Sequence, residues 1–93
     1  MFTIKLMGFH ELETRSFFTI GVLLRNESDF PLANDYAQLC ATELESATWI
    51  LCNAYDCDGI TVDVCDEHGD VAVSYELIPG RPMTVYFVDE CHE

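Results

Sequence analysis

Apolar and polar residues alternate at the beginning of the chain. Phe2, Ile4 and Leu6 are separated by single residues, and this period of two predicts a β-strand at the N-terminus. After a polar turn, residues 16–24 are nearly all apolar and rich in residues that favour strands. They predict a second, central strand that pairs back on the first, although a continuous apolar run of this length also fits a buried helix.

A change from a period of two to a period of three or four follows this second run. Pro31 suits the first turn of a helix, because its missing N–H would be unpaired there anyway. The spacing beyond it predicts one amphipathic helix over about residues 31–46. The expected inward stripe of this helix consists of Leu32, Tyr36, Cys40, Leu44 and Ala47. The expected solvated stripe consists of Asp35, Gln38, Thr42 and Glu45.

The pattern after the helix returns to strands. Residues 48–54 are mostly apolar and predict a strand that runs back from the helix. Large apolar residues occupy every second position in residues 60–65 and 71–77, and most of the positions between them are polar. They predict a β-hairpin with one apolar face and one solvent-exposed face, and Asp63 and Glu76 fall on the exposed face.

A final strand over residues 83–87 completes the predicted layout. The expected fold class is α+β, with the order β-β-α-β-β-β-β. In this fold a mostly antiparallel sheet is covered on one face by a single helix. Residues 1–93 are expected to form one domain, since the chain is 49% hydrophobic and 12% aromatic and contains no linker.

Acidic residues dominate the charge of the chain, with 17 Asp and Glu against 4 Lys and Arg and a net charge of −13. The first 25 residues carry Lys5, Arg15 and Arg25 against Glu11 and Glu13, a sum of +1, so the remaining residues carry −14. Contact with phosphates requires Lys and Arg, and so few of them exclude direct binding of nucleic acid. A folded body with such a field attracts basic surfaces instead.

The cysteines bear on the compartment of the protein. An odd number of cysteines without an export signal predicts reduced thiols in a cytoplasm. No apolar run approaches the ~20 residues that a membrane-spanning helix needs, so no membrane is expected among the partners. The five cysteines are Cys40, Cys52, Cys57, Cys65 and Cys91.

One cysteine pattern has the spacing of a metal site. Cys65 and His68 form a Cys-x-x-His pair, and Cys57 and Cys91 could supply two further zinc ligands. The second closely spaced pair that is usual in structural zinc sites is missing, so no cofactor is expected. A small zinc-stabilised domain remains an alternative. The chain also lacks Gly-x-Ser-x-Gly, His-Glu-x-x-His and glycine-rich phosphate-loop motifs, and we expect that it is not an enzyme.

The carboxylates concentrate in the turns and on the exposed face of the predicted hairpin. Alternate side chains repeat every ~6.6 Å along a strand, a spacing comparable with that of phosphates along a nucleic-acid backbone. A rigid acidic surface of this kind can therefore compete with DNA or RNA for a basic groove. The expected partner-binding residues are Asp56, Asp58, Asp63, Asp66, Glu67, Asp70 and Glu76.

In size, charge, predicted α+β organisation and cysteine usage, the chain resembles the small acidic inhibitors of bacteriophages, including anti-CRISPR and anti-restriction proteins that mimic DNA. The resemblance includes no sequence motif. It implies an inhibitor that acts in the host cytoplasm and occupies the basic nucleic-acid-binding surface of a host protein or nucleoprotein complex. The alternative is a small assembly or adaptor module that self-associates through an open sheet edge, as a homodimer for example.

Overall fold

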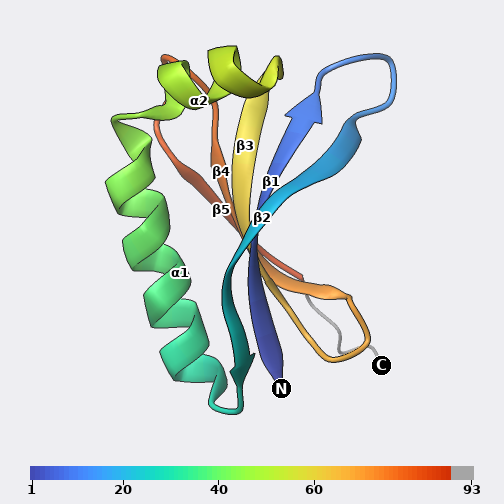
Figure 1. Cartoon of the computed structure of the whole chain (residues 1–93), viewed down its shortest axis with the longest axis vertical. Helices are drawn as coiled ribbons and strands as arrows, with labels where there is room; N and C mark the ends of the chain where they lie inside the picture. The colour runs from blue at the N-terminus through green and yellow to red at the C-terminus, as the bar shows by residue number, and fades with distance from the viewer. Residues whose placement is uncertain (89–93) are drawn as a thin grey trace.

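The computed structural model describes residues 1–88 and shows an α+β fold, as expected. Five strands form one antiparallel sheet in the order β2-β1-β3-β4-β5 (Figure 1). Two helices, not one, connect β2 to β3, so the predicted order of elements is wrong at this point. The elements are β1 (Phe2–His10), β2 (Ser16–Glu27), α1 (Phe30–Glu45), α2 (Thr48–Tyr55), β3 (Gly59–Cys65), β4 (Val71–Leu77) and β5 (Thr84–Phe87).

Helix α2 occupies the segment that was predicted to be a strand. Its inward residues Thr48, Leu51 and Cys52 are three and four positions apart, which is the spacing of one helix face. The hydroxyl of Thr48 donates to the carbonyls of Leu44 and Glu45 at 3.2 and 2.9 Å and fixes the junction with α1. A short apolar run does not distinguish a strand from a half-buried helix, and the packing of this face decides between them.

The second strand was expected at the centre of the sheet, but β2 lies at its edge. Its pairing with β1 is confirmed, with register shifts along the ladder. The central strand is β3, all seven residues of which are buried. A strand that is covered on both faces explains why polar Asp63 and Thr61 are buried beside apolar neighbours.

Helix α1 covers one face of the sheet and packs through alanines. Ala33, Ala37 and Ala41 are fully buried, whereas Leu32 of the predicted inward stripe is exposed. The inward face is therefore rotated by about one residue from the prediction. Small side chains allow the helix axis to approach the sheet closely, where the alanines join Val62 and other strand residues in the core.

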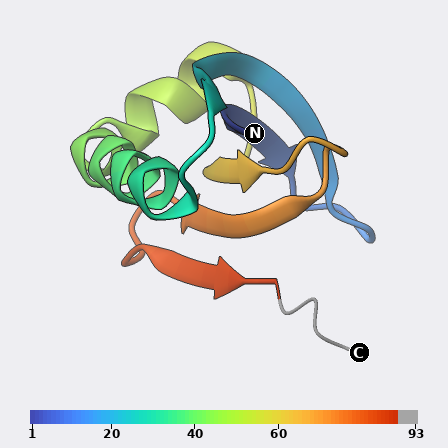
Figure 2. The ribbon, with the colours of Figure 1, turned by 90° about the horizontal axis from the view of Figure 1, so that it is seen from below.

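No helix of residues 1–88 lies on the opposite face of the sheet, yet this face contains buried side chains. Figure 2 shows that the strands curve around this face instead of lying flat. Phe9 is completely buried there and packs across the sheet on Gly59, its register partner in β3. None of the helices in the described residues has the length and apolar character needed to cross a membrane.

The contact between Phe9 and Gly59 leads to a test of the fold. A Cβ atom at position 59 would overlap the ring of Phe9, whereas a Cβ atom at Gly21 would meet nothing within 4 Å. We expect Gly59→Ala to lower the free energy of unfolding by about 2 kcal/mol, because the buried ring has to move. The control Gly21→Ala should change it by less than about 0.5 kcal/mol or increase it. Urea denaturation followed by circular dichroism measures both, and equal values would contradict this packing.

Candidate functional site

The exposed acidic residues predicted to bind a partner lie at two opposite ends of the sheet. Asp56 and Asp58 lie between α2 and β3 at one end, which we call the α2 end. Asp66, Glu67 and Asp70 lie in the turn between β3 and β4 at the other end (Figure 1). Strand β3 separates the two groups by about 20 Å, because each residue of a strand advances ~3.3 Å. The predicted residues therefore do not form one continuous patch.

Two of the predicted residues do not face solvent. Asp63 and Glu76 are only 7% and 5% exposed, so their expected position on a solvated hairpin face is wrong. The curvature of the sheet encloses that face and removes both carboxylates from contact with a partner. Asp63 accepts a hydrogen bond from the hydroxyl of Ser74 at 2.7 Å. Burial raises the pKa of Asp63, while Ser74, Thr61 and Lys5 act in the opposite direction.

Glu76 forms an ion pair with Arg15, which approaches from the loop between β1 and β2. The guanidinium contacts the Glu76 carboxylate, binds Glu11 at 2.6 Å and lies over the Phe9 ring at 4.3 Å from its centroid. Tyr86 of β5 donates its hydroxyl proton to Glu76 at 3.2 Å. Side-chain hydrogen bonding to Glu11, with Glu76 contributing further, raises the pKa of Arg15. These contacts join the loop to the sheet, and the Glu76 carboxylate is buried away from a partner.

At the α2 end, hydrogen bonds hold the first loop against the start of β3. The amide of Glu11 donates to Oδ2 of Asp58 at 2.6 Å, and the amide of Asp58 donates to the carbonyl of Phe9 at 2.9 Å. The ring Nε2 of His10 lies 2.7 Å from the carbonyl oxygen of Asp56. These bonds bring Glu11 beside two of the predicted acids, although its part of the sequence has no net negative charge.

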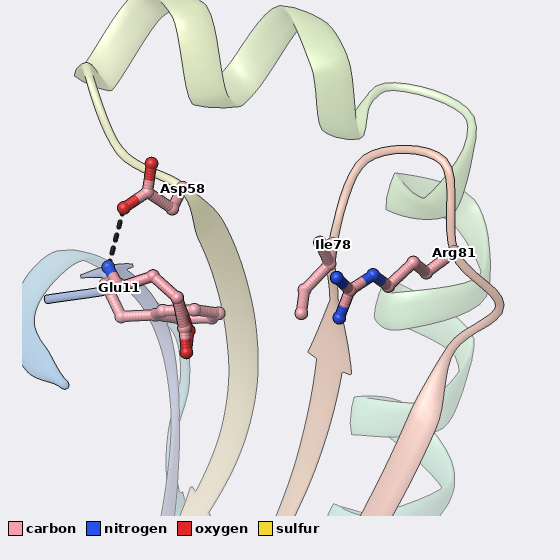
Figure 3. A pocket seen from close by; sticks show the side chains of 5 residues that line it. Glu11, Asp58, Ile78 and Arg81 are labelled. Atoms are coloured by element: carbon pink, nitrogen blue, oxygen red, sulfur yellow. Dashed lines mark hydrogen bonds between the residues drawn. The ribbon is translucent and has the colours of Figure 1, made fainter. Parts of the chain in front are cut away.

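A pocket opens beside this cluster. Figure 3 shows Glu11 and Asp58 on one wall and Ile78 and Arg81 on the other, and Phe9 also lines the space. Its volume is about 470 Å³. Because its two walls carry opposite charges, the pocket itself is not a simple cation site, and the negative character of this end comes from the surface around it.

The outer face of α2 adds large apolar side chains to the same end. Trp49 is 65% exposed and Ile50 is 70% exposed, with Asn53 and Ala54 beside them on the solvent side of the helix. Tryptophan is enriched among the residues that contribute most to protein–protein interfaces. An exposed apolar face next to Asp56 therefore has the composition of a binding surface.

Little of the negative charge is matched by cations. Among residues 1–88, the carboxylates in ion pairs are those of Glu11, Glu67 and Glu76. Asp56 and Asp58 therefore have no cationic partner among these residues. Their charge remains available to a basic surface.

The candidate zinc ligands are not brought together. Cys57 precedes β3 and Cys65 ends it, so they lie at opposite ends of the strand, while His68 lies in the turn beyond Cys65. Cys91 lies outside the described residues. No group of three or more His, Cys, Asp or Glu side chains within residues 1–88 is arranged to hold a metal ion.

The fold and the site define a small α+β domain with unpaired carboxylates and an exposed tryptophan at one end of the sheet. Comparisons of the chain with protein-family models, curated proteins and solved structures give no match. The function is therefore inferred from the residues of the site.

The ion pair of Arg15 gives one prediction for this site. Arg15→Met leaves the Glu76 carboxylate buried without its cation and should lower the free energy of unfolding by about 2 kcal/mol. Adding Glu76→Gln should recover most of the loss, because the amide is neutral and still accepts from Tyr86. The control Arg25→Met, at an exposed arginine without an ion pair among residues 1–88, should have almost no effect. If the double variant is no more stable than Arg15→Met, the ion pair between Arg15 and Glu76 does not stabilise the fold.

The buried carboxylate of Asp63 gives a second prediction, on pH. The pKa of Asp63 is higher in the folded chain than in the unfolded chain, so the folded chain binds more protons at a pH between these two values. The free energy of unfolding therefore falls as the pH rises from the lower value to the higher one. Asp63→Asn should therefore stabilise the protein at neutral pH and lose this advantage below the ordinary aspartate pKa of 3.8. Urea denaturation across pH measures the difference. Asp35→Asn, at an exposed position, is the control, and a destabilised Asp63→Asn protein at neutral pH would contradict the prediction.

Proposed function

We propose that this protein is an acidic binding protein that inhibits a nucleic-acid-handling host complex by occupying its basic groove in the host cytoplasm. The proposal places it with the small phage inhibitors of the anti-CRISPR and DNA-mimic type. The observation that supports it most is the group of carboxylates held at the α2 end, where Asp58 is fixed by two backbone hydrogen bonds and has no cationic partner in residues 1–88. Direct binding of nucleic acid has no part in this function.

Fixed carboxylates favour binding in two ways. Their negative field accelerates the approach of a basic surface and makes association sensitive to salt. Because backbone hydrogen bonds already position Asp58 and the loop of Glu11, little side-chain entropy is lost when the partner arrives. Trp49 and Ile50 then supply apolar area that slows dissociation.

The opposite end of the sheet is less available to a partner. The Asp66 carboxylate accepts the amides of His68 and Asp70, both at 2.9 Å, and so stabilises its own turn. Glu67 binds the terminal amino group of Met1 at 3.1 Å. We assign the partner contact to Asp56 and Asp58 because the exposed Trp49 and Ile50 lie at the same end, while the other end contributes to the overall field.

A competition assay tests this function. Purified RNA-guided nucleases and restriction enzymes are bound to fluorescent duplex DNA, and the protein is added as competitor. It should displace DNA from at least one of them, with inhibition at least tenfold weaker at about 200 mM than at about 50 mM salt. The double substitution Asp56→Asn with Asp58→Asn should weaken inhibition at least tenfold. The amide at position 58 keeps an oxygen that can accept the Glu11 amide.

The matched control is Glu67→Gln with Asp70→Asn, which removes the same charge from the opposite end. It should weaken inhibition less than about threefold, since only the general field changes. Equal losses for the two double variants would overturn the assignment to the α2 end. If the protein displaces DNA from none of the enzymes tested, the proposed function itself is wrong.

A further inference from the structure

Strand β5 (Thr84–Phe87) is a short edge of the sheet that carries neither a charged residue nor a proline. Within residues 1–88 its one neighbour is β4, and the residues from Thr84 to Val88 carry no charge. Four consecutive large side chains are exposed, with Phe87 at 68%. The other edge, β2, is irregular, because its ladder contains register shifts and it carries Arg25 and then Asn26 in a left-handed conformation. Charges and irregularities of this kind hinder pairing with another chain, and β5 lacks them.

The backbone of β5 shows which groups are free to pair. The amide of Val88 donates to the carbonyl of Ala72 at 2.9 Å, so the polar groups of Val88 point toward β4. Successive residues of a strand direct their N–H and C=O groups to opposite sides. Tyr86 therefore also points toward β4, whereas Val85 and Phe87 direct their N–H and C=O groups away from the sheet. Two residues thus offer two donors and two acceptors at the open edge.

We infer that β5 binds β5 of a second copy of this chain in an antiparallel pair centred on Tyr86. In this register Val85 of one copy lies opposite Phe87 of the other, and all four free N–H and C=O groups of each strand are paired, giving four hydrogen bonds. The two Tyr86 residues face each other at the closer type of antiparallel position, where aromatic pairs are favourable. A shift by two residues would leave half of these groups unpaired.

The twofold axis of such a pair is perpendicular to the sheet, so the two α1 helices lie on the same face of one continuous sheet. Val85 and Phe87 are register partners of Tyr75 and Val73, which are buried on the face covered by α1. In the dimer, the exposed Val85 and Phe87 side chains of the two copies therefore meet on this face. The apolar side chains of each copy are thereby shielded from water by those of the other copy, and this burial stabilises the dimer.

Charge favours a second copy at this edge over other parts of the surface. Two chains of −13 repel each other, and residues 84–88 bring no charged side chain of their own into the contact, unlike either acidic end. A strand of four residues makes a small interface. We therefore expect a reversible dimer with a dissociation constant on the order of 10 μM. This inference does not depend on the proposed inhibition, because β5 contains none of the contact carboxylates.

Sedimentation equilibrium tests the dimer. The wild-type protein should be mainly dimeric at about 100 μM and mainly monomeric at about 1 μM. Phe87→Lys should weaken dimerisation at least tenfold by placing a charge at the apolar seam. Leu12→Lys, at an exposed position in the β1–β2 loop, should leave it unchanged. Both changes reduce the net negative charge equally, so repulsion between whole chains cannot explain a difference between them.

Cysteine cross-linking tests the register. At the central position the two α-carbons are about 4.5 Å apart, within the range of a disulfide. Tyr86→Cys should therefore form a disulfide between residues 86 of two copies under mild oxidation, identified by peptide mass spectrometry. Val85→Cys alone should not, whereas a mixture of Val85→Cys and Phe87→Cys should form the mixed disulfide. A wild-type monomer at about 100 μM, a Phe87→Lys dimer of unchanged stability, or an 85–85 disulfide without the 86–86 disulfide would overturn the inference.

Discussion

The structure depends on the burial of β3 on both faces. On one face Ile60, Val62 and Val64 pack beneath α1, whose alanines allow a close approach. The other face has no helix from the described part of the chain, and the sheet curves so that neighbouring strands shield it (Figure 2). This curvature determines which polar side chains are internal and which remain at the surface.

Because that second face is enclosed, some of the acidic residues of the chain are buried and do not contribute to its surface. Glu76 is inside and needs Arg15, while Asp63 is inside and accepts from Ser74. The Arg15 contact also connects the β1–β2 loop to the sheet. Hydrogen bonds from the same loop to Asp58 then hold it at the α2 end. The ion pair between the buried Glu76 and Arg15 thus also helps to position the exposed carboxylates of the α2 end.

The surface that results is divided by function. The α2 end combines fixed carboxylates with an exposed tryptophan, a combination suited to a basic partner. Strand β5 is uncharged and apolar, and suits a second copy of the chain. In the turn after β3, Asp66 accepts backbone amides and the exposed Glu67 pairs with the terminal amino group of Met1. Net charge alone does not reveal this division, because it counts internal and external carboxylates equally.

The sequence by itself determined the local features. The period of two identified the β3–β4 hairpin, and Pro31 with the spacing beyond it identified α1, since side-chain periodicity follows directly from backbone geometry. Only the tertiary structure decided that residues 48–54 form a helix, that β2 is an edge and that Ala33, Ala37 and Ala41 face the core. It also decided that Glu11 joins Asp58 while Asp63 and Glu76 are buried. The reason is that strand order and sheet curvature depend on contacts between distant segments, and no local pattern records which segments will shield one another.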